Sequence, residues 1–228
     1  MKTKKAVTIN NKEYTLRRSV YTINYSPIAV SDSMSGKMNG IPSISTSCLL
    51  NSNCQRYRKI EGSICKKCYA HATVSRYSSL AKNLESNFYL LTEQILPTEL
   101  LPIFSEYLTT IVRFESFGDL ENETQAINYA NIAKLSPKVI FALWTKNPHI
   151  AKKAFDKVGK PENLILIQSS PIINKEVVKA NEHIDKVFTV YDKEGQRTQP
   201  INCGSRACAT CRRCYSKDTE TEVFEALK

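Results

Sequence analysis

Apolar residues along this chain switch several times between strict alternation and helical spacing. Short alternating stretches on either side of Asn10-Asn11 predict a β-hairpin within residues 6–25. Residues 31–47 are rich in turn formers and become strand-like just before Cys48. Between residues 75 and 94 apolar positions return every three to four residues, which predicts an amphipathic helix.

Beyond residue 98 the pattern becomes regular. Further helices are predicted over residues 99–108, 121–135, 148–158 and 174–180. Strands are predicted over residues 111–117, 139–144, 164–168 and 187–191. Asn147-Pro148 is a typical helix start, with asparagine as the cap and proline at the first helical position. Strands that alternate with helices in this way indicate parallel βαβ units.

The number of these units limits the architecture. With the strand before Cys48 there are five or six, too few for a closed barrel of eight. We therefore predict an α/β fold, a partial (open) βα barrel of five to six parallel strands with a cysteine-rich C-terminal segment. The expected parts are an N-terminal β-hairpin extension (1–30), the partial barrel with a first cysteine cluster (31–200), and a C-terminal cysteine-rich metal-binding segment (201–228).

Polar residues follow three of the predicted strands where they end. Gly118 and Asp119 follow the first, Thr145 and Asn147 the second, and Ser169 the third. Ligands of parallel sheets bind beyond the carboxyl ends of the strands. We therefore expect these residues to lie together at that end of the partial barrel, which we call the mouth, with the C-terminal cysteine segment folded over it. Each residue alone is also explained as a turn former, and Asp119 and Asn147 as helix caps.

Eight cysteines fall into two short groups, and these are the strongest chemical signal in the chain. The first group is Cys48, Cys54, Cys65 and Cys68, and the second is Cys203, Cys208, Cys211 and Cys214. Cysteines two residues apart converge on one point, which suits a metal ion or an iron–sulfur cluster, whereas a disulfide framework scatters its cysteines. The N-terminus shows no secretory signal, so we expect a reducing, cytoplasmic location.

The second group favours an iron–sulfur cluster over zinc. Its C-x-x-C-x-x-C repeat with Cys203 as a remote ligand is typical of ferredoxin-type 4Fe–4S sites. The three histidines have no paired spacing, although an all-cysteine zinc site that joins Cys65 and Cys68 to Cys211 and Cys214 remains an alternative. For the first group we predict three ligands, Cys54, Cys65 and Cys68, with Cys48 nearby, because three thiolates leave one iron open for a ligand.

Charge extends this picture toward anionic partners. The 228 residues include 32 basic and 22 acidic side chains, a net charge of +10, and several basic residues lie within the cysteine groups. This charge predicts attraction to nucleic acid or a phosphorylated substrate, or else compensates the anionic thiolates. No apolar run reaches the roughly 18–20 residues that a membrane span requires. The oligomeric state is left open.

Four motifs, in order, resemble the phage family called gene product 88. They are the runs over residues 35–45, 65–70, 113–120 and 141–147. The resemblance extends from about residue 31 to residue 215 and identifies lineage better than activity.

The architecture also resembles the radical S-adenosylmethionine enzymes, which place a cysteine loop after the first strand of a partial barrel. That resemblance implies that Cys54, Cys65 and Cys68 hold a 4Fe–4S cluster whose open iron binds S-adenosylmethionine. It further implies that Gly118 admits the cofactor closely and that Asp119 meets its ammonium group. The chain departs from the usual spacing, since ten residues separate Cys54 from Cys65.

Two functions follow as expectations. The first is an iron–sulfur enzyme of this kind, with one or two clusters, that acts on a nucleotide or nucleic acid. The second is a noncatalytic iron–sulfur or zinc protein that binds nucleic acid or a host protein.

Overall fold

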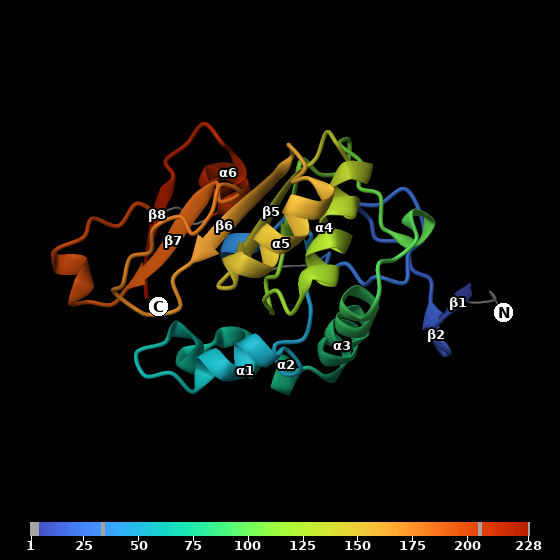
Figure 1. Ribbon diagram of the computed structural model, residues 1–228, viewed down its shortest axis with the longest axis horizontal. Coiled ribbons are helices and arrows are strands. Elements are labelled where there is room, and N and C mark those ends of the chain that lie inside the picture. The colour runs from blue at the N-terminus through green and yellow to red at the C-terminus, as the bar shows by residue number, and fades with distance from the viewer. Residues whose placement is uncertain (1–4, 33–34, 205–206, 228) are drawn as a thin grey trace.

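A computed structural model describes residues 5–32, 35–204 and 207–227 (Figure 1). The described chain begins with an antiparallel hairpin of β1 (Ala6–Ile9) and β2 (Lys12–Thr15). Asn10 and Asn11 form its turn with φ angles of 47° and 59°, the left-handed region that asparagine tolerates better than most residues. The predicted hairpin is confirmed.

The centre of the molecule is a sheet of six parallel strands whose spatial order follows the chain. Its strands are β3 (Ser43–Ile44), β4 (Ile111–Phe114), β5 (Ile140–Thr145), β6 (Leu164–Ser169), β7 (Lys186–Tyr191) and β8 (Glu222–Ala226). The α/β class, the number of parallel strands and the cysteine-rich C-terminal segment are thereby confirmed. The described sheet is open, with β3 and β8 at its edges, and β8 is a strand that the sequence pattern did not predict.

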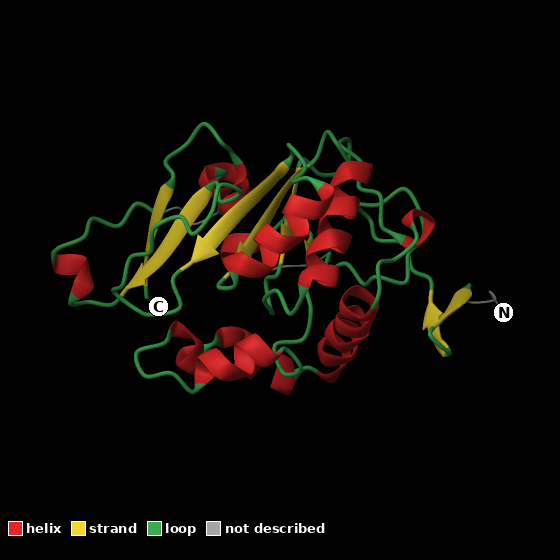
Figure 2. Ribbon diagram, viewed as in Figure 1, coloured by secondary structure: helices red, strands yellow, loops and turns green. Residues whose placement is uncertain are grey.

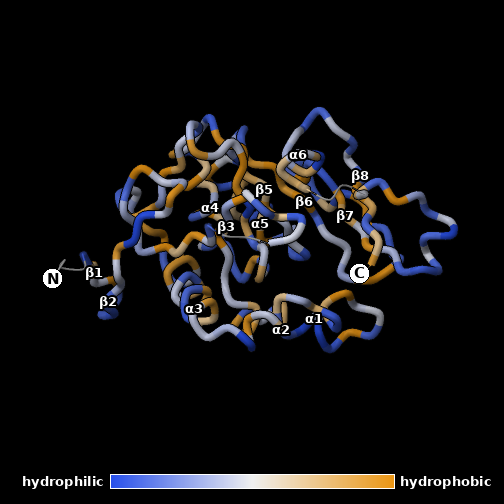
Figure 3. Tube along the Cα trace, turned by 180° about the vertical axis from the view of Figure 1, so that it is seen from behind, coloured by the Kyte–Doolittle hydropathy of each residue, from blue (hydrophilic) through white to orange (hydrophobic). Residues whose placement is uncertain are grey.

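Three helices cover one face of the sheet and enclose the main core. They are α3 (Ser78–Glu93), α4 (Glu123–Leu135) and α5 (Pro148–Val158), and α4 packs against both of its neighbours. Phe114 of β4 stacks between Tyr129 and Phe141, with ring centroids 4.2 and 5.1 Å apart. Figure 3 shows hydrophobic residues concentrated in this region, and no described helix is long and apolar enough to cross a bilayer.

The second cysteine segment covers the opposite face of the sheet, which we call the inner face. This segment carries the short helix α6 (Cys208–Cys211) and the turn η5 (Arg213–Tyr215). Tyr215 packs edge-on against Trp144 of β5, with ring centroids 5.8 Å apart. Arg212 donates a 2.7 Å hydrogen bond to the hydroxyl of Thr110, at the amino end of β4. The prediction that this segment folds over the mouth was therefore wrong, because its apolar side chains bury against the inner sheet face instead.

Two predicted helices are absent from the described chain. Residues 99–108 contain only the turn η3 (Thr98–Leu100), because Pro102 follows and the side chain of Asn24 takes up the backbone groups of Leu101 and Ile103. Residues 174–180 are irregular, since the Gln168 side chain bonds the carbonyl of Val178 and the N–H of Ala180. The strand predicted over residues 111–117 ends at Phe114, because Glu115 has a φ of 57°.

Candidate metal-binding site

The first cysteine segment forms a layer beyond the carboxyl ends of the strands, where the arrowheads in Figure 2 point. We call residues 48–76 the lid; they include α1 (Ser52–Arg58), the turn η2 (Ile64–Lys67) and α2 (Tyr69–Arg76). Asn51 caps α1 by accepting the N–H of Cys54 at 2.8 Å. The same side chain donates to the Asp119 carbonyl at 2.9 Å, so the α1 cap and the loop after β4 are joined directly.

The lid is also joined to β5 and to the loop after β6. The hydroxyl of Tyr57 donates to the Lys146 carbonyl at 3.1 Å, immediately after β5. Ile64 donates its N–H to the carbonyl of Pro171 at 3.0 Å, and the Ser63 hydroxyl accepts the N–H of Cys65 at 3.1 Å. Attachment to three successive strand ends fixes Cys54, Cys65 and the chain between them over the mouth.

Asp119, Thr145 and Asn147 come together beneath the lid, as the sequence predicted. The buried Asp119 carboxylate accepts the Thr145 hydroxyl at 2.6 Å and the N–H of Lys146 at 3.1 Å. Thr145 in turn accepts the N–H of Asn147 at 2.9 Å. The alternative role of Asp119 as a helix cap was wrong, because Asn122 caps α4 by accepting the N–H of Gln125.

The other two predicted site residues lie differently. A side chain at Gly118 would overlap the Glu115 carboxylate and approach the Thr46 hydroxyl to 2.7 Å. The space over Gly118 is therefore filled by the protein itself, which corrects the expectation that it admits a ligand. Ser169 ends β6 on the inner face, and among the described residues it makes no hydrogen bond with the Asp119 group.

Lys146 is the cation of this site. Burial favours its neutral amine, yet the neighbouring thiols of Cys65, Cys54 and Cys68 and the Asp119 carboxylate together hold the pKa of Lys146 above its ordinary value. Its ammonium makes no hydrogen bond with any described residue. Three lid thiols and one carboxylate from the sheet edge thus surround one ammonium group.

The lid thiols are buried enough to be protonated unless a metal binds them. Burial raises the pKa of Cys54 and Cys65, and it raises the pKa of Cys48 to about 12. A bound metal reverses this preference, because it holds its thiol ligands as thiolates. Cys48 packs in an apolar cluster with Ala70 and Val74, and Cys54 and Cys68 pack against the same cluster.

The described thiols do not form a compact site for a single ion. Among the described residues, no three thiols lie within 4.8 Å of one another. Tetrahedral zinc, with Zn–S bonds of about 2.3 Å, brings its sulfurs to about 3.8 Å. The ligand sulfurs of a four-iron cubane bind different irons and stand farther apart.

The second cysteine segment forms its own cationic site on the inner sheet face. Lys37 lies 3.7 Å from the Cys203 sulfur and pairs with Glu225 at 2.8 Å. Burial, with a smaller contribution from the Cys203 and Cys208 thiols, raises the pKa of Cys214 to about 12. Arg213 keeps one buried N–H group, Nη1, without an acceptor. Such an orphaned donor needs an acceptor, and Arg206 lies outside the described residues.

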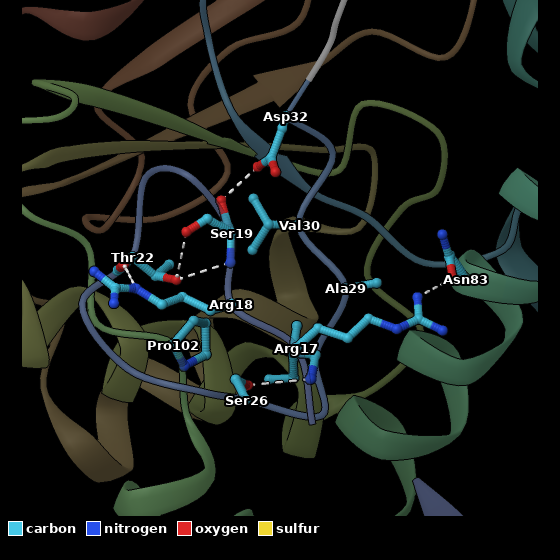
Figure 4. A pocket seen from close by; sticks show the side chains of 11 residues that line it. Arg17, Arg18, Ser19, Thr22, Ser26, Ala29, Val30, Asp32, Asn83 and Pro102 are labelled. Carbon is cyan, nitrogen blue, oxygen red and sulfur yellow. Dashed lines mark hydrogen bonds between the residues drawn. The ribbon is translucent and has the colours of Figure 1, made fainter. Parts of the chain in front are cut away.

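A separate cavity of about 130 Å³ lies between the N-terminal segment and α3 (Figure 4). Arg17 donates to the Asn83 side chain at 2.6 Å, and Arg18 donates to the Thr22 carbonyl at 3.0 Å. Asp32 accepts the hydroxyl of Ser19. The lining contains no cysteine, so this cavity is independent of both cysteine sites.

The sequence model of the family described as Gene product 88 matches residues 3–223. The chain belongs to the gene product 88 family. This confirms the resemblance drawn from the four motifs. No curated protein and no solved structure matches the chain.

The family motifs surround the two cysteine sites of this gene product 88 protein. Residues 65–70 and 113–120 meet through the hydroxyl of Tyr69, which donates to the Ser116 carbonyl at 2.5 Å. Residues 141–147 supply Trp144, Thr145 and Lys146. Asn51 also shapes the mouth but carried no sequence signal, because its role arises only from docking of the lid.

Proposed function

We propose that this gene product 88 protein is an iron–sulfur protein in which Cys54, Cys65 and Cys68 hold a 4Fe–4S cluster with one iron open to a small ligand. The observation that carries the proposal is the docking of the lid, which contains these three thiols, onto the backbone of Asp119 and Lys146 beyond the carboxyl ends of the strands. No three of the described thiols stand as close together as the ligands of one zinc ion. Cys48, which packs in the apolar cluster, is a neighbour and not a ligand.

The ligand proposed for the open iron is S-adenosylmethionine. Its amino acid portion carries an ammonium and a carboxylate, and the site offers a charge of the opposite sign for each. Oδ2 of Asp119 accepts one protein hydrogen bond, from the N–H of Lys146 at 3.1 Å, and so has a lone pair for the ammonium. The Lys146 ammonium is free to pair with the carboxylate. When bound, the cluster supplies an electron and a coordination position.

A second cluster is proposed on Cys203, Cys208, Cys211 and Cys214. Lys37 supports it, because its ammonium lies 3.7 Å from the Cys203 sulfur. The radical S-adenosylmethionine-like activity and a substrate of the nucleotide or nucleic acid class belong to this proposal.

A noncatalytic role in nucleic acid binding is the second candidate. It is favoured by the outer surface of the lid, where Arg56, Lys59 and Lys67 are exposed and have no carboxylate partner among the described residues. Phosphate groups are the natural partners of such unpaired cations. An iron–sulfur or zinc site would then serve to hold the lid in shape.

The test is spectroscopic and uses protein purified without oxygen. We expect broad absorbance near ~400 nm that dithionite bleaches, with iron and sulfide in equal amounts. Addition of S-adenosylmethionine to the reduced protein should change its electron paramagnetic resonance signal. Asp119→Asn should weaken this change, whereas Asp218→Asn, at an exposed position, should not. A colourless protein loaded with zinc, or a signal indifferent to the cofactor, would reject the open-iron proposal.

A further inference from the structure

Arg113 is a cation without an acidic partner on the inner face of the sheet. Its guanidinium lies 4.0 Å from the centre of the Trp144 ring, and one terminal nitrogen lies 3.6 Å from the sulfur of Met38. Its Nε is buried and has no acceptor. No carboxylate among the described residues pairs with Arg113. Because thioether sulfur is a weak acceptor, most of the hydrogen-bonding capacity of this group is unused.

The two cysteine segments meet at this guanidinium. Tyr69 directly follows Cys68 of the first, and Tyr215 directly follows Cys214 of the second. The Tyr215 hydroxyl and a terminal nitrogen of Arg113 both approach the Met38 sulfur, at 3.7 and 3.6 Å. The Tyr69 hydroxyl donates to the carbonyl of Ser116, three residues beyond Arg113 on the same segment. The position therefore lies between the two proposed clusters and belongs to neither ligand set.

Aromatic side chains form the surroundings of the guanidinium. Trp144 stacks on Arg113, and Tyr215 packs edge-on against Trp144 at 5.8 Å. Tyr69, whose hydroxyl bonds the backbone just beyond β4, packs against Phe117, with ring centroids 6.2 Å apart. Tyr69 is 62% exposed, so this side opens to solvent. Flat apolar walls beside an unpaired guanidinium suit a ligand that combines a ring with an oxyanion.

We propose that Arg113 binds the phosphate or carboxylate of a substrate with a flat ring, in a site that opens beside Tyr69. This assignment rests on the proposed function for its place next to the first cluster, and it names the class of substrate. Half-buried arginine without an acceptor is unfavourable in the free protein, and an incoming oxyanion removes that cost.

The chain contains a single tryptophan, Trp144, so its fluorescence reports directly on the Arg113 position. Anaerobically purified protein is titrated with two matched pairs of probes: AMP with adenosine, and benzoate with benzyl alcohol. We expect a saturable change with the anionic member of one pair and a much weaker response to its neutral partner. The pair that responds distinguishes phosphate from carboxylate.

Variants then locate the binding group. Arg113→Gln should weaken binding about tenfold or more, because it removes a charge-assisted hydrogen bond. Arg113→Lys should be intermediate, since it keeps the charge but not the planar fork. Arg76→Gln, on the exposed end of α2, is the charge-matched control and should bind as the wild type does.

Iron content measured on the same samples separates the two proposals. Saturable AMP or benzoate binding by protein without iron would reject the cluster but keep the role of Arg113. Iron-loaded wild type that shows no saturable response, or responds equally to both members of each pair, would overturn the role of Arg113. If the wild type fails this test and the Arg113→Gln variant also contains less iron, the role of Arg113 is to compensate the negative charge of the Cys208 and Cys214 thiolates, with which its guanidinium also interacts.

Discussion

Gly118 stands where the carboxylate of Glu115 needs space, so the absence of a side chain at one residue permits burial of the other. The Glu115 carboxylate accepts hydrogen bonds from Tyr129, from the Thr46 hydroxyl at 3.0 Å and from Gln125 at 2.6 Å. This network joins the end of β4 to α4 and to the residues just before the lid. The floor of the mouth is thus a buried polar network and not a ligand pocket.

Gly118→Ala should destabilise the protein. The added methyl group would overlap Glu115 and approach Thr46, and overpacking of this kind costs about 1–3 kcal/mol. Urea unfolding under anaerobic conditions measures the change. Gly204→Ala is the control, because an added Cβ there meets no atom within 4 Å, and a loss of stability as large as that of Gly118→Ala would contradict this account.

Stability should fall as pH rises through neutrality on account of Glu115. Burial raises the pKa of its carboxyl from 4.5 to about 7, so between these values the folded protein holds a proton that the unfolded chain has released. The resulting stabilisation is present at pH 4.5 and lost by about pH 7, a change of up to about 3 kcal/mol. Melting temperatures at pH 5 and pH 8 should differ less in Glu115→Gln than in the wild type.

Replacement of Cys54 and of Cys48 should have different consequences. Cys54→Ser should remove the iron of the first site, whereas Cys48→Ala should leave it bound and cost only packing energy in the apolar cluster with Ala70 and Val74. Iron and sulfide per chain are measured after anaerobic purification of each variant. Loss of iron from Cys48→Ala would identify a closed cluster with four protein ligands.

Cys211→Ser should lower both iron content and stability, even though Cys211 is exposed in the structure. Loss of a ligand uncouples the second cysteine segment from its metal, and metal binding contributes to folding. If both sites are loaded, about half of the iron should disappear. Unchanged iron and an unchanged melting temperature would exclude Cys211 as a ligand.

Binding to nucleic acid, if the lid provides it, should weaken steeply with salt. Each phosphate contact contributes about −0.7 to −0.9 to the slope of log K against log salt concentration. Lys59→Gln with Lys67→Gln should therefore reduce the slope by about 1.5, while Lys82→Gln with Lys153→Gln, on exposed positions of α3 and α5, should not. If the protein binds neither labelled DNA nor labelled RNA at low salt, the basic residues of the lid do not serve nucleic acid binding, and their role is to compensate the negative charge of the thiolates.

The strands were predictable where burial alone decides the backbone. β5 and β6 are continuous apolar runs buried on both faces, and both lie within one residue of the predicted bounds. Residues 99–108 and 174–180 carry helical spacing, but Pro102 and the Gln168 side chain impose other backbone partners. β8 is short, and Glu222 and Glu225 flank its only two large apolar residues, Val223 and Phe224, so its pairing with β7 has a weak local signal.

The site was predictable to the level of residue type and strand end. Parallel strands bring their carboxyl ends to one edge, so Asp119, Thr145 and Asn147 could be placed together from the pattern alone. The surroundings of Gly118 and Ser169 could not be predicted in this way. They depend on which neighbouring side chains pack against these two residues, and the spacing of residues along the chain does not show this. The path of the second cysteine segment depended on the apolar inner face that Tyr215 covers.

The second cysteine segment is the connection between β7 and β8, so this segment must cross the sheet before β8 can pair with β7. During synthesis the ribosome releases residues 203–214 before residues 222–226, and β8 reaches β7 only after the intervening chain has crossed the inner face. Until then β7 is an open edge, the part of a parallel sheet most prone to pairing with another chain. If the second cysteines bind iron as proposed, the iron supply during expression should affect how much of the protein escapes aggregation, because a metal that holds these cysteines together would bring β8 closer to β7.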